Sequence, residues 1–393
     1  MPASVRLPVI RAAADACPGV FAPHDAADGA VARIRLPGGA VSAAALRAVA
    51  DCAQDLGDGR VHLTSRGNLQ LRGLSRASDL AARLGAAGLL PSPAHERVRN
   101  VLASPLSGIA GGRADVRCLA AELDRELCHR PGLARLPRRF LFALDDGRGD
   151  VAAEEPDVCW RATSATSGEL LVAGVAIARV GLPHAVGALL DAAEAFLTLR
   201  AADGGTAWRA TELPDAPARI AAALEGRSAL QESHLHATWL HEGGFPATAR
   251  PGPVRRDDGG IALVVAAVLG ELTADQVRLL ATTGPRVVIT PWRTVVLPEP
   301  LLPVEQLAAG GLLVAPGPAA TVSACIGRPG CAKSLADVRT DARAALTHLP
   351  DARMHVSGCP RRCGAPRAVH VDALALPDGG YLVDGVPRPG LVP

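Results

Sequence analysis

Two stretches decide the fold: RVHLTSRGNLQL at residues 60–71 and RVVITPWRTVVL at residues 286–297. Each consists of two short runs rich in apolar and β-branched residues around a turn, which predicts a pair of neighbouring strands. A strand pattern and then a helix pattern precede each stretch, in the same order. This β-α-β-β order occurs twice with little identity between the copies, so the sequence predicts two duplicated half-domains.

The segments before each stretch carry matching signals. In the first copy, residues 32–36 predict a strand, Ser42 is suited to cap a helix, and the glycines in 57–59 end it. In the second copy, residues 261–266 predict a strand, Thr273 is suited to cap the helix that follows, and Gly284 ends it. The two copies therefore agree in their start and stop signals as well as in their strands.

The rest of the chain predicts two larger α/β lobes. Helix and strand patterns alternate between the copies, with a helix expected near 121–127, strands within 138–146 and 169–180, and a helix near 185–199. Pro- and Gly-rich tracts at 214–217 and 250–260 predict connections. The predicted fold class is α+β, with half-domains at 16–78 and 255–305 and lobes at 79–230 and 315–393.

Composition narrows the class of protein. The chain has 393 residues, of which 49% are hydrophobic and 20% charged, so it can bury cores and is not disordered. A formal charge of +2 gives no bulk electrostatic argument for nucleic acid or membrane surfaces. Neither a long apolar span nor a secretory signal is recognised, which predicts a cytoplasmic protein. The single lysine, Lys333, and the two asparagines, Asn68 and Asn100, all fall inside motifs.

Four of the nine cysteines are grouped late in the chain, as Cys325-x5-Cys331 and Cys359-x3-Cys363. Two close pairs on two loops can supply the four thiolates of a 4Fe-4S cluster. Zinc is the rival metal, but its cysteine pairs usually have two residues between them. Buried structural cysteine is the third interpretation. Glycines in the same loops would let the backbone approach a cluster closely: Gly327, Gly330, Gly358 and Gly364.

The sequence around these cysteines resembles a known family. CIGRPGC (325–331) and HVSGCPRRCG (355–364) resemble the cluster motifs of the nitrite/sulfite reductase superfamily. LTSRGNLQLRGL (63–74) resembles its half-domain signature, and RNVLASPLSG (99–108) resembles its substrate loop. The resemblance implies two ferredoxin-like half-domains, two α/β lobes, the first of which binds substrate, and a tetrapyrrole beside the cluster.

Two branches of the superfamily compete. The opening ACPGVFAPHDAADGAVARIRLPGG (16–39) and TPWR (290–293) resemble the precorrin-3B synthase subfamily. The siroheme reductases share a Lys-x-Lys strand, whereas here Arg139 stands at the first lysine and Leu141 at the second. Loss of that second charge and proton donor disfavours a siroheme-dependent nitrite or sulfite reductase, which stays the alternative. A non-catalytic iron–sulfur carrier is a third interpretation, disfavoured because a carrier needs no large lobes.

The synthase resemblance implies O2-dependent hydroxylation of precorrin-3A at C20 with closure of a γ-lactone. Precorrin-3A carries eight carboxylates, which planar guanidinium groups can bind in a bidentate manner. No catalytic residue is identified. Surface arginines and turn-forming asparagines are the plain alternatives for the predicted substrate-binding residues, which are Arg66, Asn68, Arg72, Arg99, Asn100, Arg139 and Arg293.

The synthase resemblance also implies a mononuclear non-haem iron, with histidine or carboxylate ligands. His234, His236 and His241, in ESHLHATWLHE, form the densest group of candidates, although exposed histidines without a metal are the plain alternative. His355 and His62 are weaker candidates. No nucleotide-binding glycine motif is recognised, so a partner reductase or ferredoxin is expected to pass electrons from NAD(P)H. The internal repeat predicts a monomer, and siroheme is expected only under the reductase alternative.

Overall fold

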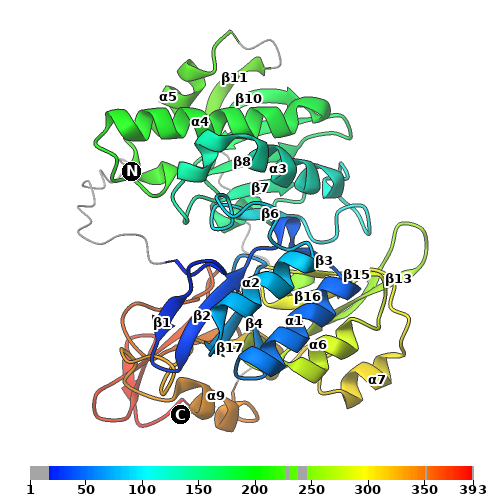
Figure 1. Ribbon diagram of the computed structural model, residues 1–393, viewed down its shortest axis with the longest axis vertical. Helices are drawn as coiled ribbons and strands as arrows, with labels where there is room; N and C mark the ends of the chain where they lie inside the picture. The colour runs from blue at the N-terminus through cyan, green and yellow to red at the C-terminus, as the bar shows by residue number, and fades with distance from the viewer. Residues whose placement is uncertain (1–16, 227–229, 238–245, 350–351, 392–393) are drawn as a thin grey trace. The chain divides into compact units, whose positions relative to one another are not determined.

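The computed structural model describes residues 17–226, 230–237, 246–349 and 352–391 (Figure 1). The chain divides into two compact units, one containing residues 91–242 and the other containing residues 18–90 and 243–393. The second unit is therefore built from both sides of the first unit in the sequence. Among the described residues, no helix combines the length and the apolar character needed to cross a membrane.

The first half-domain lies in the second unit and follows the predicted order. Ser42 caps its main helix, accepting the Ala45 N–H at 3.2 Å, and Gly57 ends that helix, as the sequence predicts. Its elements are β1 (His24–Ala26), β2 (Gly29–Ile34), β3 (Ala40–Ser42), α1 (Ala43–Leu56), β4 (Arg60–Leu63), β5 (Leu69–Leu74) and α2 (Ala77–Ala86).

The second half-domain repeats this order. Thr273 caps its helix in a reciprocal capping box with Gln276. Its elements are β12 (Gly252–Arg255), β13 (Ile261–Ala266), β14 (Glu271–Thr273), α6 (Ala274–Leu280), β15 (Arg286–Ile289), β16 (Thr294–Leu297) and α7 (Val304–Ala309). The prediction that 250–260 is only a connection is wrong, because residues 252–255 form an edge strand paired with β13. Pro253 is tolerated there because an edge strand need not donate every N–H.

The two half-domains exchange strands. β3 of the first pairs with β15 of the second, and β14 of the second pairs with β4 of the first. The resulting sheets have the orders β1-β2-β5-β4-β14 and β12-β13-β16-β15-β3, so each takes its last strand from the other copy. Helices α1 and α6 pack together and share one apolar core, to which Val49 and Val277 contribute fully buried side chains. The predicted duplication within an α+β fold is confirmed.

The described part of the first unit forms an α/β lobe around a six-stranded sheet. Its core includes the fully buried Trp160, Phe142 and Phe196. The prediction that 214–217 is a connection is wrong in part, because a helix begins at Ala216, with Pro217 in its first turn, where proline is favoured. The elements are β6 (Val101–Ala103), α3 (Arg117–His129), β7 (Phe142–Asp145), β8 (Val158–Ala162), β9 (Ser167–Val172), β10 (Val175–Gly181), α4 (Ala185–Ala202), α5 (Ala216–Ala223) and β11 (Leu230–Ala237).

The last lobe belongs to the second unit and shares its topology with the first lobe. In β6 to β10 and in β17 to β21, successive strands pair parallel, parallel, antiparallel and antiparallel. A helix, α3 or α9, connects the first two strands in each case. The elements are α8 (Pro318–Thr321), β17 (Val322–Ala324), α9 (Val338–Ala345), β18 (Met354–Ser357), β19 (Val371–Ala375), β20 (Tyr381–Val383) and β21 (Val386–Arg388). The four predicted segment boundaries stay predictions.

Candidate functional site

The four grouped cysteines follow two neighbouring parallel strands. Cys325 comes directly after β17 and Cys359 two residues after β18, so both loops leave the same edge of the sheet. The Cys325 N–H bonds the Val356 carbonyl at 2.9 Å, and the Gly358 N–H donates to Cys325 Sγ at 3.3 Å. The strand register therefore brings the two cysteine loops together.

The thiols also influence one another electrostatically. Burial raises the pKa of the Cys325 thiol; the N–H groups of Gly358 and Gly327 lower it, and Cys363 and Cys331 raise it further. Burial likewise raises the pKa of Cys363, which Arg361 lowers and Cys359 and Cys331 raise. All four cysteines are free of disulfides. Three half-buried thiols and the exposed thiol of Cys363, with the Gly358 N–H already aimed at sulfur, fit a site that a bound metal cluster would stabilise as thiolates.

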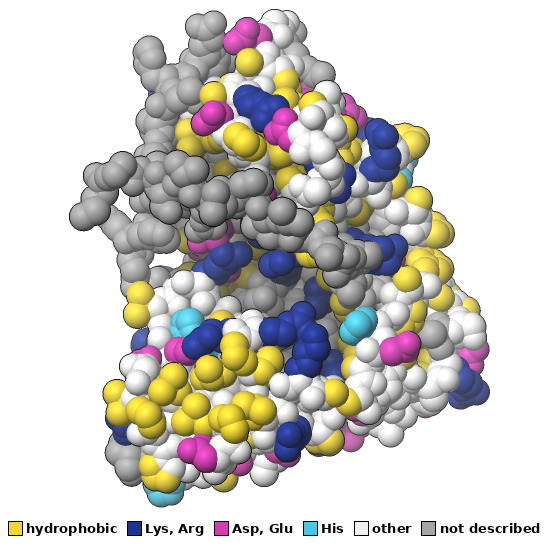
Figure 2. Space-filling model, turned by 90° about the vertical axis from the view of Figure 1, so that its left-hand side faces the viewer, with side chains coloured by type: hydrophobic (Ala, Val, Ile, Leu, Met, Phe, Trp, Pro, Cys, Tyr) yellow, Lys and Arg dark blue, Asp and Glu magenta, His cyan; other side chains and the backbone are white. Residues whose placement is uncertain are grey.

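Positive charge accompanies the cysteine loops. Residues 325–334 and 359–370 contain no Asp or Glu. Their exposed cationic residues are Arg328, Lys333, Arg361, Arg362 and Arg367. Figure 2 also shows a group of Lys and Arg side chains on the face of the second unit that it presents. Such surfaces attract anionic groups.

Two turns in the half-domains are built alike. Thr64 N–H bonds the Asn68 carbonyl and Thr290 N–H bonds the Thr294 carbonyl, each at 3.0 Å. In the aligned repeats, Gly67 and Arg293 occupy the same position, and both have φ of 62°. Arg66 therefore corresponds to Trp292, and both are half-buried at a strand end. Rigid scaffolds commonly present binding groups at such positions.

Three other predicted substrate residues in this unit make internal contacts. Arg72 donates two bonds to Asp28, each at 2.8 Å, and a third to the Gly330 carbonyl at 3.0 Å. Arg293 donates to the Gly364 carbonyl. The buried Asn68 accepts the Leu36 N–H at 2.8 Å through Oδ1. These contacts give the three residues structural roles, and a direct contact with substrate stays a prediction.

The predicted substrate residues of the first unit are also engaged. Arg99 is buried and forms a two-bond ion pair with Asp124, at 2.6 and 2.7 Å. Asn100 is buried and donates to the Arg138 carbonyl at 3.0 Å, which holds the segment before β7. Arg139 is exposed, with its guanidinium carbon 6.0 Å from the Trp208 ring centroid. Arg139 is thus the most accessible of these three side chains.

The candidate iron ligands do not form one described group. His234 and His236 belong to strand β11, but their side chains and the whole of His241 lie outside the described part. His62 lies between Asp58 and Glu271, 3.8 and 3.6 Å from their carboxylates. His355 is fully buried, its Nδ1 is 2.8 Å from Ser323 Oγ, and burial with nearby Arg293 and His370 lowers its pKa to about 3.

Sequence reasoning missed a buried acidic group in the first lobe. Oxygens of Asp145, Asp146 and Asp150 lie within 4.8 Å of one another. Arg148 forms an ion pair with Asp146 at 2.6 Å, and burial and the Asp145 charge raise the pKa of Asp150 to about 7. The run LDDGRGD was the available signal. The Arg148 guanidinium offsets part of this negative charge, and the N–H groups of Gly147, Gly149 and Ala152 donate to Asp145.

This acidic group occupies the topological position of the cysteine loops. Ser104 directly follows β6, just as Cys325 directly follows β17. Each side chain accepts a hydrogen bond from the next loop: Ser104 Oγ from the Asp146 N–H at 3.1 Å, and Cys325 Sγ from the Gly358 N–H. The two lobes therefore carry different chemistry on the same backbone framework.

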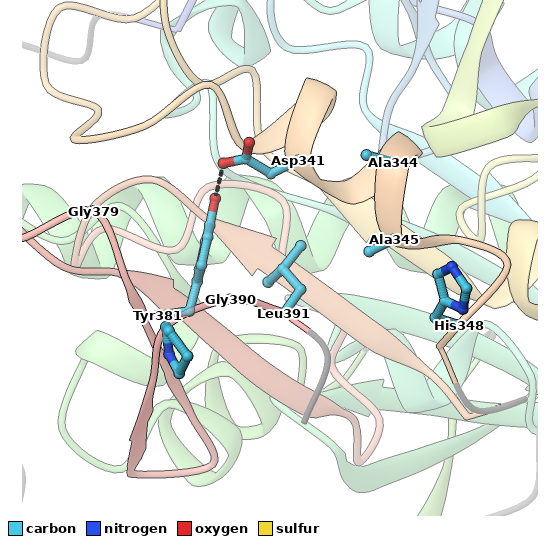
Figure 3. A pocket seen from close by; sticks show the side chains of 9 residues that line it. Asp341, Ala344, Ala345, His348, Gly379, Tyr381, Gly390 and Leu391 are labelled. Atoms are coloured by element: carbon cyan, nitrogen blue, oxygen red, sulfur yellow. Dashed lines mark hydrogen bonds between the residues drawn. The ribbon is translucent and has the colours of Figure 1, made fainter.

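A separate cavity of about 330 Å³ lies in the last lobe, beside α9 and β20 (Figure 3). Tyr381 donates to Asp341 at 2.5 Å in its wall, while Ala345 and Leu391 supply apolar surface. Burial and the Asp341 carboxylate raise the pKa of Tyr381. The volume is near the lower limit for small-ligand pockets, and the residues lining it include none of those predicted to bind substrate.

Comparisons with known proteins found a matching half-domain and relatives of two kinds. Residues 24–87 match the nitrite/sulfite reductase ferredoxin-like half domain. A precorrin-3B synthase from Sinorhizobium sp is 26% identical over 392 residues, covering 94% of this chain and 83% of the relative. A ferredoxin–nitrite reductase from Synechococcus elongatus is 34% identical over 140 residues, covering 33% of this chain and 27% of that protein.

The solved structure of the Mycobacterium tuberculosis NirA protein has a similar fold. Its TM-score is 0.70 at 21% identity, covering 90% of this chain and 74% of that one. Similarity to the synthase thus extends along almost the whole chain, whereas similarity in sequence to the nitrite reductase covers a third of it.

Proposed function

We propose that this chain, whose residues 24–87 match the nitrite/sulfite reductase ferredoxin-like half domain, acts on a tetrapyrrole as an oxidoreductase of the precorrin-3B synthase type. The observation that carries the proposal is the similarity to a precorrin-3B synthase over 94% of the chain. In the proposed reaction, one atom of O2 becomes a hydroxyl at C20 of precorrin-3A, and a ring-A acetate closes the γ-lactone. The other oxygen atom leaves as water, with two electrons from an external reductant and two protons.

The environment of Leu141 supports this proposal over siroheme-dependent reduction. The siroheme reductases have a second lysine at the position that Leu141 occupies in this chain. Its side chain is 3% exposed, and its N–H donates to Asp157 at 2.8 Å. A buried apolar side chain supplies neither a cation nor a proton to a bound anion. The reductase alternative is kept because of the 34% identity to the nitrite reductase over a third of the chain.

The proposed cofactor of the last lobe is a 4Fe-4S cluster held by Cys325, Cys331, Cys359 and Cys363. When bound, such a cluster supplies single electrons. The chain's own groups favour it by offering four free thiols, the N–H of Gly358 toward sulfur, and loops free of carboxylates. A partner reductase or ferredoxin is the proposed electron donor.

A mononuclear non-haem iron is also proposed, from the resemblance to the synthase subfamily. His234, His236 and His241 stay its candidate ligands because they form the densest histidine group in the sequence. Histidine and carboxylate ligands with open positions suit iron that reacts with oxygen.

Labelled oxygen tests the reaction. We expect anaerobic enzyme to be inactive and turnover under labelled O2 to place one labelled atom in the product. The purified protein should show the broad absorption of an iron–sulfur cluster without the intense bands of siroheme. Rapid anaerobic reduction of nitrite or sulfite, together with siroheme bands, would instead establish the alternative. A loaded cluster with no tetrapyrrole turnover would support the electron-carrier interpretation.

Arg66 is proposed to bind a carboxylate of the tetrapyrrole from the turn between β4 and β5. Replacing it with alanine should weaken binding by about 1.5–3 kcal/mol, the range for hydrogen bonds to charged groups. Arg66→Lys should restore only part of the affinity, because lysine keeps the charge but loses the planar fork. The measurement is an anaerobic titration with precorrin-3A or a stable uroporphyrin analogue.

The matched control for Arg66 is Arg83→Ala, which removes an exposed arginine paired with Asp55 on the same half-domain. Cluster content should survive in both variants. Unchanged affinity in Arg66→Ala, with an intact cluster spectrum, would remove Arg66 from the substrate site.

A further inference from the structure

Each cysteine loop is held by an arginine from a different half-domain. Arg72, on β5 of the first half-domain, is 6% exposed and donates through Nη2 to the Gly330 carbonyl at 3.0 Å. Its Nε and Nη2 also bond the two Asp28 oxygens, which fixes the plane of the guanidinium. The contact falls on the residue directly before Cys331.

Arg293 makes the corresponding contact from the second half-domain. It lies in the turn between β15 and β16 and donates through Nη2 to the Gly364 carbonyl, directly after Cys363. Its φ of 62° belongs to a region that residues other than glycine rarely adopt, and the equivalent position in the first half-domain is Gly67. A residue in this conformation is held there by its surroundings, and the bond to Gly364 is one such contact.

Neither contacted glycine has room for a side chain: a Cβ would meet Asp28 and Ile326 at Gly330, and Arg293 at Gly364. A Cβ on Gly330 would lie 2.6 Å from the Asp28 Oδ2 that accepts from Arg72, and a Cβ on Gly364 would lie 2.8 Å from Arg293 Nη2. The close approach occurs independently in the two loops. It explains why glycine adjoins a cysteine in both, at 330–331 and at 363–364.

We propose that Arg72 and Arg293 are positioning residues for the four-cysteine site, clamping one cysteine loop each to its half-domain. This inference rests on the proposed cluster, because four thiolates must converge on one small object. Both clamps act through the backbone next to a cysteine, so they fix where the sulfur points. Both guanidinium groups thereby contact the loops, a role that their sequence motifs do not predict, while contact with substrate carboxylates stays a prediction.

The test is retention of iron by anaerobically reconstituted protein. Arg72→Ala and Arg293→Ala should lose iron to a ferrous chelator about 10- to 100-fold faster than wild type, the usual cost of removing a partner behind a metal ligand. The electron paramagnetic resonance spectrum of the reduced cluster should change in both variants. Arg72→Lys and Arg293→Lys should slow the release again in part, since lysine can donate one bond to the same carbonyl.

Matched controls separate this effect from general destabilisation. Arg83→Ala and Arg278→Ala each remove an exposed ion-paired arginine from a half-domain helix, and both should release iron at the wild-type rate. Gly330→Ala keeps every arginine but pushes the loop from Asp28, so it should also accelerate release.

The outcomes distinguish the clamp from the proposed function. If wild-type protein takes up no cluster, both the proposed cluster site and the clamp are refuted. If wild type holds a cluster and the Arg72, Arg293 and Gly330 variants release iron at the wild-type rate with an unchanged spectrum, the clamp is overturned while the cluster site stands. If the variants bind tetrapyrrole more weakly but release iron at the wild-type rate, the clamp is likewise overturned. The two arginines would then be assigned to substrate binding.

Discussion

Cys363→Ser protein is expected to contain almost no iron–sulfur cluster after anaerobic reconstitution, and Cys359→Ser protein is expected to behave in the same way. Each substitution leaves three thiols where four are needed, and a serine hydroxyl is far less acidic than a thiol and a much poorer ligand for iron. Cys363 is exposed, so the substitution itself should disturb folding little. Activity should disappear with the iron content.

The matched control is Cys118→Ser, which changes an equally exposed cysteine on α3 of the other unit. Cys128→Ser on the same helix is a second control, whereas the buried Cys52 is a poorer one because serine would place an unpaired hydroxyl in the core. Iron content should stay at the wild-type value in the α3 variants. Equal loss of iron in Cys118→Ser and Cys363→Ser would refute the cluster assignment.

Glu271 is expected to be the most sensitive single carboxylate for the stability of the second unit. It lies on the exchanged strand β14, with a side chain 6% exposed. Its Oε1 accepts from Arg60 of the first half-domain and from Arg343 of α9 at 2.7 Å. Its Oε2 pairs with Arg339 of α9 at 2.8 Å. One carboxylate thus joins both half-domains to the cysteine lobe.

Replacing Glu271 with glutamine should cost about 3–5 kcal/mol, the usual result of removing one partner of a buried ion pair. Arg339 accounts for most of the loss, because its side chain is only 10% exposed and would be left charged without its carboxylate. The control is Asp275→Asn, whose side chain is 91% exposed and pairs with Arg278. An exposed pair of this kind is worth about 0–1 kcal/mol.

Urea unfolding followed by circular dichroism measures both variants. The Glu271→Gln midpoint should fall well below the wild-type midpoint, and the Asp275→Asn midpoint should stay close to it. Equal midpoints for wild type and Glu271→Gln would show that the surrounding arginines are solvated without Glu271.

The difference in stability between wild type and Glu271→Gln should change with pH in one direction. Burial acts to raise the pKa of Glu271, but Arg339, His62, Arg60 and Arg343 together hold it below its ordinary value of 4.5. A lowered pKa in the folded state gives stability that is present above 4.5 and is lost as the pH falls through the folded value. The gap between wild type and Glu271→Gln should therefore be full at neutral pH and shrink below pH 4.5. A gap that widens on acidification would contradict this assignment.

The sequence predicted elements whose signals are local. Ser42 and Thr273 cap their helices as expected, because a cap needs only its own first turn. Strands β3 and β14 were missed because each has three residues and is defined by a partner strand of the other half-domain. Strand β12 was missed because Gly252 and Pro253 predict a turn, and pairing with β13 overrides that preference.

The residues of the candidate site also divide into those with a local sequence signal and those defined only by long-range contacts. The cysteine spacing alone singled out the four thiols as candidate ligands, because two close pairs on two loops can supply the thiolates of one cluster. The contacts of Arg72 and Arg293 could not be predicted, because each joins residues more than 70 positions apart. The acidic group at Asp145, Asp146 and Asp150 was missed because its carboxylates are adjacent in a run typical of an exposed turn, and only the lobe packing buries them.

The strand exchange between the half-domains also sets an order of events during synthesis. The first sheet lacks its edge strand β14 until residue 273 has been made, although β4 is complete at residue 63. At about 5–20 residues per second, the roughly 200 intervening residues take about 10–40 s to translate. Throughout that interval β4 presents an open edge, the feature that promotes pairing between unrelated chains. Residues 91–242 are all made before that partner strand exists, so the first sheet stays incomplete while they emerge from the ribosome.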